Sequence, residues 1–173
     1  MSWKNIDGWF SDGDEQMYLN ILGSIPEGGH FLEVGCFKGR STVCMAEAIT
    51  KYNRNITIHV VDTFEGDVDT GAQETYKEFM KNMELYRHLL GSVMKGYSEH
   101  MAKENEVMFD AIYIDALHTY DSVTCDIVSW VPHLRFGGTI GGHDYNWSEV
   151  HKAVNDKFTE IIPIGNSWIV YTA

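Results

Sequence analysis

The sequence predicts an α/β fold of the Rossmann-like type, a three-layer sandwich in which a seven-stranded, mostly parallel sheet has helices on both faces. Two observations lead to this prediction. Short apolar runs alternate along the chain with segments whose apolar residues recur at helical spacing. Four of the apolar runs also end in an acidic residue. Because parallel strands in such a sheet end at one edge, we expect these acids to lie near one another.

The first half of the chain alternates between the two patterns. Pro26 ends the leading helix, and Asp62 closes a β-branched run. The predicted elements are a helix at 14–24, a strand at 30–34, a helix at 41–52, a strand at 56–61, a helix marked by residues from Tyr76 to Leu90, and a weak strand at 92–95.

The second half continues the alternation. Pro132 closes a clean helical stripe, and Gly137-Gly138 is expected to turn the chain into the next strand. The predicted elements are a strand at 109–114, a helix at 120–131, a strand at 139–142, a helix capped by Ser148, and closing strands at 161–162 and 168–171. We expect one strand near the C-terminus to be antiparallel.

The bulk composition limits the possible classes of protein. With 173 residues, 44% of them hydrophobic, we expect a single domain over 1–173 with a short N-terminal helical segment at 1–29. The net charge of −12 disfavours nucleic acid as a partner, because such proteins need a basic face. No apolar run approaches the roughly 20 residues of a membrane helix, and three cysteines without CxxC spacing disfavour a disulfide framework. We therefore expect a cytoplasmic protein that binds no membrane, and we leave a homodimer open.

The segment 33–42 resembles a binding loop at the end of the first strand. Gly35 and Gly39 permit backbone angles closed to other residues, and Glu33 sets a negative charge at the strand's carboxyl end. A carboxylate there repels a pyrophosphate and attracts an amine. The middle glycine of the GxGxxG dinucleotide fingerprint is absent, which disfavours a nicotinamide cofactor.

Four acids end four different predicted strands: Glu33, Asp62, Asp115 and Asp144. For any one of them, a merely polar strand end is the simpler explanation, but four together favour a ligand site. Asp62 is placed where an acid accepts hydrogen bonds from ribose hydroxyls. S-adenosylmethionine has a ribose, an adenine, a cationic sulfonium and an amino-acid tail, so it can use carboxylates at Glu33 and Asp62.

Three segments, 33–42, 114–120 and 137–145, resemble in register the motifs of class I S-adenosylmethionine-dependent methyltransferases. The nearer resemblance is to the branch that contains catechol, caffeoyl-CoA and macrolide-sugar O-methyltransferases, and it covers about residues 30–157. The cofactor-binding residues that the resemblance implies are Glu33, Gly35, Gly39, Ser41, Asp62, Ser98 and Asp115.

The same resemblance implies a divalent-metal site at Asp115 and Asp144. Tyr145 stands where the catechol-type enzymes have asparagine, so His143 is a candidate third ligand for magnesium or another divalent metal. The alternative is that Asp144 only caps its loop.

The candidate catalytic residues are His118 and Asp115. His118, three residues after Asp115, is our first candidate for the catalytic base; a metal ligand and a structural histidine are the alternatives. We thus expect methylation of a hydroxyl group on a small molecule or sugar. The alternatives are a protein resembling the cephalosporin hydroxylase-like group and a catalytically silent S-adenosylmethionine-binding protein. Five aromatic residues are candidates for an acceptor pocket: Trp3, Trp9, Phe10, Trp147 and Trp168. Core packing or a subunit interface is the default explanation for such residues, and we expect Trp168 to lie in the core.

Overall fold

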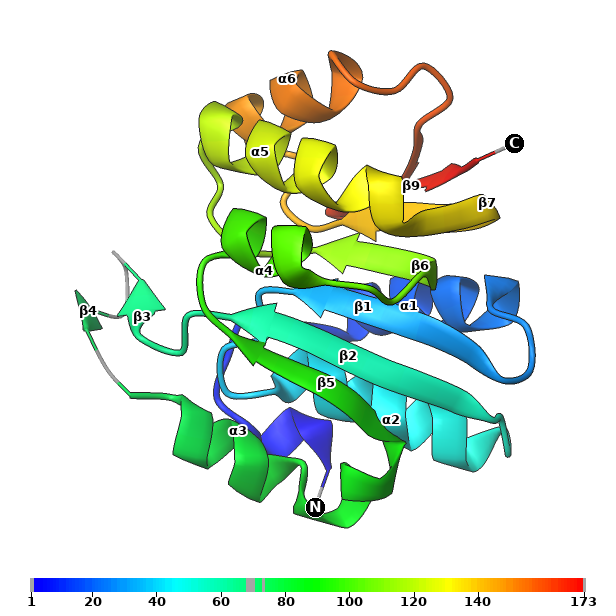
Figure 1. Cartoon of the computed structure of the whole chain (residues 1–173), viewed down its shortest axis with the longest axis vertical. Helices are drawn as coiled ribbons and strands as arrows, with labels where there is room; N and C mark the ends of the chain where they lie inside the picture. Colours follow the sequence, from blue (N-terminus) through cyan, green and yellow to red (C-terminus); the bar gives the residue numbers. More distant parts are fainter. Residues whose placement is uncertain (1, 68–70, 73, 173) are drawn as a thin grey trace.

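A seven-stranded sheet forms the middle layer of the computed structural model, which describes residues 2–67, 71–72 and 74–172 (Figure 1). In spatial order the strands are β5 (Leu90–Lys95), β2 (Ile56–Asp62), β1 (Gly29–Val34), β6 (Phe109–Ile114), β7 (Leu134–Gly142), β9 (Ser167–Tyr171) and β8 (Ile162–Ile164). The first five pair in parallel, and β9 runs antiparallel to both of its neighbours. This confirms the predicted fold class.

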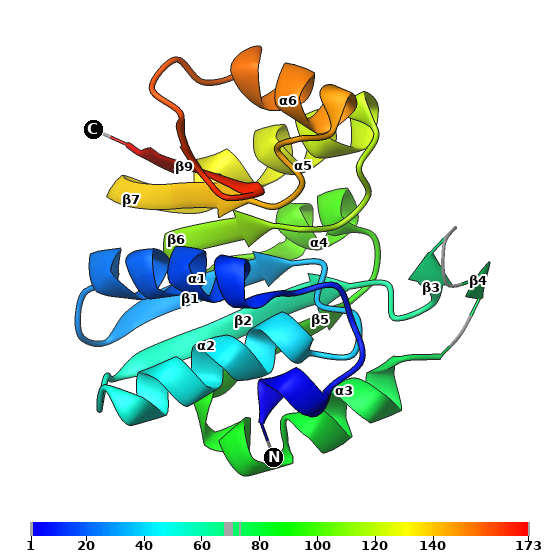
Figure 2. The same ribbon diagram turned by 180° about the vertical axis from the view of Figure 1, so that it is seen from behind.

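Helices cover both faces of the sheet, as two opposite views show (Figure 1 and Figure 2). One face carries α1 (Asp12–Ser24), α2 (Arg40–Lys51) and α3 (Tyr76–Asn82), and the other carries α4 (Ser98–Glu104), α5 (Tyr120–Trp130) and α6 (Ser148–Asn155). The short elements are the 3-10 turns η1 (Trp3–Asn5), η2 (Glu84–Leu89) and η3 (Val131–His133) and the hairpin strands β3 (Gly66–Asp67) and β4 (Gly71–Ala72). No helix in the described ranges is long and apolar enough to cross a membrane.

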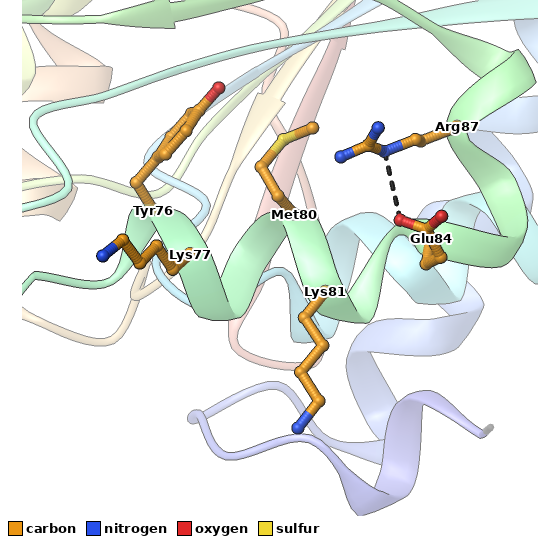
Figure 3. A pocket seen from close by; sticks show the side chains of 6 residues that line it. All are labelled: Tyr76, Lys77, Met80, Lys81, Glu84 and Arg87. Atoms are coloured by element: carbon orange, nitrogen blue, oxygen red, sulfur yellow. Dashed lines mark ion pairs between the residues drawn. The ribbon is translucent and has the colours of Figure 1, made fainter.

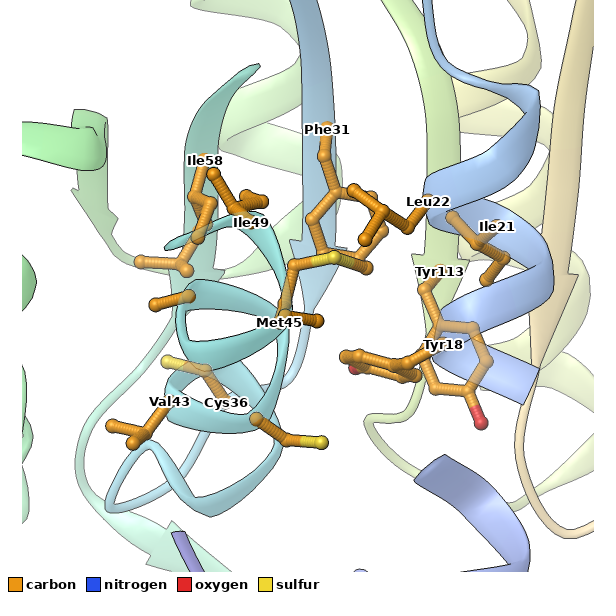
Figure 4. Close-up of a cluster of buried hydrophobic side chains, with 14 of the residues drawn as sticks. Tyr18, Ile21, Leu22, Phe31, Cys36, Val43, Met45, Ile49, Ile58 and Tyr113 are labelled. Atoms are coloured by element: carbon orange, nitrogen blue, oxygen red, sulfur yellow. The ribbon is translucent and has the colours of Figure 1, made fainter. Parts of the chain in front are cut away.

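The alternation of side chains along the strands divides the interior into two cores. On the α1 and α2 side, Phe31 packs with Tyr18 and Tyr113, and the Tyr18 ring centroid lies 5.8 Å from that of Phe31 and 4.9 Å from that of Tyr113 (Figure 4). On the other side, Leu32 belongs to the core under α5 and α6, which includes the fully buried Trp130. Successive residues of β1 therefore fix the sheet between two apolar layers.

Three elements differ most from the sequence prediction. The helix expected from Tyr76 to Leu90 ends at Asn82, continues as η2, and gives way to β5 at Leu90. Strand β7 begins at Leu134, because a register irregularity opposite β6 lets the strand pass through the glycine pair that we expected to be a turn. Helix α4 was not predicted, since Ala102 is its one fully buried residue and no apolar stripe marks it.

Candidate active site

The carboxyl ends of the central strands open into a cleft of about 910 Å³. Its walls come from the segment Asp7 to Phe10, the β1–α2 loop, the segment after β2, the start of α4, the loop after β6, one face of α5 and the loop after β7. The acids Asp62, Asp115 and Asp144 all line it. The expectation that these strand ends form one site therefore agrees with the structure.

A second hollow of about 510 Å³ lies over α3 and η2 (Figure 3). Its lining side chains are Tyr76, Lys77, Met80, Lys81, Glu84 and Arg87. Glu84 and Arg87 form an ion pair there at 3.2 Å. None of the predicted site residues lies in this hollow, so the cleft at the strand ends is the candidate active site.

Glu33 lies beneath the cleft and does not face it. Its carboxylate is fully buried and accepts hydrogen bonds from the hydroxyls of Tyr18, Ser41 and Thr42, the first at 2.7 Å. Burial raises the pKa of Glu33 to about 7, although the three hydroxyls oppose the rise. The sequence suggested that this carboxylate attracts the amine of a ligand. In the structure the carboxylate lies under the loop that starts α2 and is not among the residues that line the cleft.

Ser41 lines the cleft, but its hydroxyl hydrogen is used by Glu33. A hydroxyl has one hydrogen to donate, so in this arrangement Ser41 offers a ligand only its acceptor lone pairs. The expected hydrogen bond from Ser41 to a ligand carboxylate would require the bond to Glu33 to break.

The two loop glycines have different roles. Gly35 lines the cleft with φ +87°, and a Cβ there would lie 2.1 Å from the backbone oxygen of Asp115. Gly39 is the N-cap of α2 with φ +86°, and a Cβ there would meet the Phe79 ring at 2.9 Å. Gly35 thus lets the loop approach β6, whereas Gly39 lies outside the residues that line the cleft, contrary to the expected ligand contact.

Asp62 joins the two loops on its side of the cleft. One carboxylate oxygen accepts N–H groups of Cys36 and Phe37 at 2.8 Å each, and the other accepts the N–H of Phe64 at 2.6 Å. A carboxylate has about four acceptor positions, so about one remains for a ligand hydroxyl. Asp62 is therefore both a brace of the β1–α2 loop and a candidate ribose acceptor.

Asp115, His118 and Asp144 form a cluster on the opposite side of the cleft. Each offers a ligand atom within 4.8 Å of the others, and His118 Nε2 lies 2.9 Å from Asp144 Oδ2. Hydrogen bonds to Asp115 and Asp144 raise the pKa of His118 to about 9, above the near-neutral value expected of a base. Two carboxylates and one imidazole at this spacing can hold a divalent cation.

His143 approaches the same two acids, and its Nδ1 lies 3.7 Å from Asp115 Oδ1. Its Nε2 lies 3.1 Å from Asp14 Oδ1, on α1, and its Nδ1 lies 3.3 Å from Asp144 Oδ2. Burial lowers the pKa of His143, but the hydrogen bonds with Asp14 and Asp144 outweigh it and raise the pKa to about 11. The structure therefore brings both histidines to the two acids: His118 completes the group of ligand atoms within 4.8 Å of one another, and the expected His143 links Asp144 to Asp14. Asp14 was not found from the sequence, because it is one of three acids in the first turn of α1, where acids are ordinary.

Ser98, expected in the adenine pocket, does line the cleft. Its hydroxyl accepts the indole N–H of Trp130 at 2.8 Å and donates to Asp126. Asp126 also lines the cleft although it is only 5% exposed. Asp126 was not predicted as a site residue, because an acid in an amphipathic helix is ordinarily exposed to solvent.

Aromatic side chains border the cleft at the N-terminal segment and at the loop after β7. Trp9 packs on Phe37 with ring centroids 5.4 Å apart, and Trp147 packs on His118 at 5.0 Å. Trp9 and Trp147 are 63% and 51% exposed, so both offer free ring surface. Both line the cleft, which favours the acceptor-pocket alternative for them. Phe10 also borders the cleft but is buried in the core, as Trp3 and Trp168 are.

A fold with this strand order, a glycine loop after the first strand and an acid-lined cleft defines a class I S-adenosylmethionine-dependent methyltransferase. A family model described as a methyltransferase domain matches residues 32–145, and the chain belongs to this family. The resemblance seen in the sequence is thereby confirmed.

Known proteins with similarity to the chain agree with this class. The solved structure of the O-methyltransferase NovP has a TM-score of 0.67 and 17% identity, covering 91% of this chain and 77% of that one. The structure of CalS11, a TDP-rhamnose 3'-O-methyltransferase of calicheamicin biosynthesis, has a TM-score of 0.68 and 14% identity, with coverages of 91% and 76%. At these identities the likeness concerns the fold.

A curated relative is the uncharacterized protein y4gI of Sinorhizobium fredii (strain NBRC 101917 / NGR234). It is 25% identical over 115 residues, which are 65% of this chain. The chain spans only 13% of the length of that relative.

Proposed function

We propose that the protein transfers the methyl group of S-adenosylmethionine to a hydroxyl group of a small molecule or sugar, with the help of a divalent metal. The observation that carries this proposal is the cluster of Asp115, His118 and Asp144 in the same cleft as Gly35 and Asp62. NovP and CalS11 are O-methyltransferases, and CalS11 methylates TDP-rhamnose, a sugar nucleotide; both support the choice of a hydroxyl acceptor.

The cofactor is proposed to lie across the carboxyl ends of β1 and β2. Asp62 has about one acceptor position left for a ribose hydroxyl, and Gly35 leaves the backbone of the loop open to the methionine part. Glu33 acts from below, because its buried carboxylate holds the hydroxyls at the start of α2 in place. Its role is to shape the loop.

The metal is proposed to be held by Asp115, His118 and Asp144. Carboxylate oxygens with one imidazole suit manganese, iron or zinc as well as magnesium. A bound divalent cation supplies positive charge that lowers the pKa of an acceptor hydroxyl. His143, fixed between Asp14 and Asp144, orients the second of the two acids.

Methyl transfer is an in-line displacement. The acceptor oxygen forms a bond to the methyl carbon, the carbon–sulfur bond breaks, and its electron pair stays on sulfur to give S-adenosylhomocysteine. The hydroxyl proton is transferred to the carboxylate oxygen of Asp115 that does not serve as a ligand. The exposed rings of Trp9 and Trp147 provide apolar surface on which an acceptor can be oriented and water excluded.

The test is release of S-adenosylhomocysteine with a panel of nucleotide sugars and catechols, with manganese or magnesium and with excess chelator. We expect at least one acceptor to be methylated, with the chelator or Asp144→Asn reducing turnover by about 100-fold or more while cofactor binding persists. The matched control is Asp121→Asn, which removes another acid of the cleft wall. Full turnover in excess chelator would refute the metal, and methylation of nitrogen or carbon only would refute the hydroxyl acceptor.

A further inference from the structure

The cleft extends beyond the residues that the proposed reaction uses. Asp115 and Asp144 follow β6 and β7, whereas the segment Gly96 to Glu99 follows β5, the outermost strand of the parallel set. Asp62, at the end of β2, lies between these two ends. A ligand with its ribose at Asp62 and its sulfonium toward Asp115 and Asp144 therefore extends its base toward Gly96–Glu99.

Asp126 lies in that part of the cleft, on α5, beside Ser98 at the start of α4. Ser98 accepts from Trp130, which can only donate, so the one hydrogen of Ser98 is left for Asp126. Within residues 2–67, 71–72 and 74–172, Asp126 has no salt bridge with lysine or arginine. Its carboxyl group is thus almost fully buried, lines the cleft, and has a neutral hydroxyl as its donor.

A carboxyl group in such a place lacks donors. Burial raises the pKa of Asp126 to about 6, against the hydrogen bond from Ser98. Burying a carboxylate is costly unless further N–H or O–H groups approach it. The 6-amino group of adenine carries two N–H donors and no charge, and it is the part of the proposed ligand that lies farthest beyond the ribose.

We propose that Asp126 recognises the 6-amino group of the adenine base and makes the site selective for adenosyl over inosyl ligands. The proposal rests on the function given above. A 6-oxo group at the same place is an acceptor, so it faces the carboxylate oxygen without a hydrogen between them. Rejection of a ligand that leaves a buried polar group unpaired is a strong source of specificity.

Glu99 is the acid against which this assignment must be tested. It also lines the cleft and raises the pKa of Asp126 through its charge. Its side chain, however, is 40% exposed and lies 3.9 Å from His100 Nε2, so water already satisfies it. Glu99→Gln is therefore the matched control for Asp126→Asn.

The experiment is calorimetric titration of the full chain with S-adenosylhomocysteine and with S-inosylhomocysteine, in which a 6-oxo group replaces the 6-amino group. We expect the parent protein to bind the adenosyl ligand at least about tenfold more tightly. Asp126→Asn should reduce or reverse this ratio, since the new amide can donate to a 6-oxo group. Glu99→Gln should keep the ratio of the parent protein.

Each other outcome has a definite meaning. Equal affinity of the parent protein for both ligands overturns the inference. The inference is also overturned if Asp126→Asn keeps the affinity ratio of the parent protein, or if Glu99→Gln alone loses it. Thermal melting checks the fold of each variant, and Asp126→Ser, which also removes the charge, replaces Asp126→Asn if that protein does not fold. No binding of S-adenosylhomocysteine to the parent protein would instead refute the proposed function.

Discussion

The buried carboxyl group of Glu33 should make the stability of the protein depend on pH in a defined direction. Burial raises its pKa from 4.5 to about 7, so between these values the folded protein binds a proton that the unfolded chain has released. The stabilisation is complete below pH 4.5 and is lost as the pH rises through 7. Since one pKa unit corresponds to about 1.4 kcal/mol, the free energy of unfolding should fall by about 2–3 kcal/mol between pH 5 and pH 8 from this group.

Glu33→Gln isolates this contribution. The glutamine oxygen can accept from Tyr18 and Ser41, and its amide can donate to Thr42, so the hydrogen bonds can be kept without a titratable group. Urea unfolding of both proteins at several pH values gives the difference between them, in which groups common to both cancel. Glu104→Gln, an exposed acid at the end of α4, is the control.

We expect Glu33→Gln to gain about 2–3 kcal/mol on the parent protein from pH 5 to pH 8. The control should follow the parent curve. If the two curves of the parent and Glu33→Gln run parallel over this range, the account of Glu33 as a desolvated, partly protonated acid is wrong.

Three further predictions concern the walls of the cleft. Asp62→Asn should lower the free energy of unfolding by about 1–3 kcal/mol and weaken S-adenosylhomocysteine binding at least tenfold, because the amide nitrogen cannot accept a loop N–H. Urea unfolding and calorimetry that both give the values of the parent protein would contradict this prediction. Gly35→Ala should lower the free energy of unfolding, measured in urea, by at least about 2 kcal/mol, since its Cβ would meet the Asp115 carbonyl. Gly28→Ala, at φ +77° with open space around it, should lower it by only about 1 kcal/mol. Equal losses would refute the steric argument. Arg40→Ala should speed amide hydrogen exchange in residues 3–10 at least tenfold, because the guanidinium donates to the carbonyls of Ile6 and Phe10, the latter at 2.7 Å. Unchanged exchange would mean that other contacts hold this segment in place.

The sequence predicted most of the fold because its strands are buried on both faces. Runs such as Ala111–Ile114 are apolar throughout and are followed by an acid, so the strand and the edge at which its acid lies can both be predicted from the sequence. Helix α4 was not predicted because only one of its residues is buried. The start of β7 was not predicted because Gly137-Gly138 has the composition of a turn, although the strand continues through it with an irregular register. In both cases the prediction relied on local composition, whereas packing and strand pairing with distant segments determine the structure.

The site was predicted less completely, because side-chain direction decides which residues meet. Asp115 and Asp144 were placed by their position at strand ends, and both His118 and His143 approach them, but the contact of His143 with Asp14 on α1 could not be predicted. Gly39 has the spacing of a binding-loop glycine, yet its φ of +86° serves the cap of α2. Asp126 lies in a helix that was predicted from its apolar residues. Only its burial beside the cleft, which the structure shows, distinguishes it from a surface acid.

The claim that the cleft binds the methyl donor is tested most directly by calorimetric titration of the parent protein with S-adenosylhomocysteine. We expect saturable binding at one site per chain, lost or weakened at least tenfold in Asp62→Ala while the variant remains folded. No heat of binding to the parent protein, or the same affinity in folded Asp62→Ala, would contradict the assignment of this cleft to the cofactor.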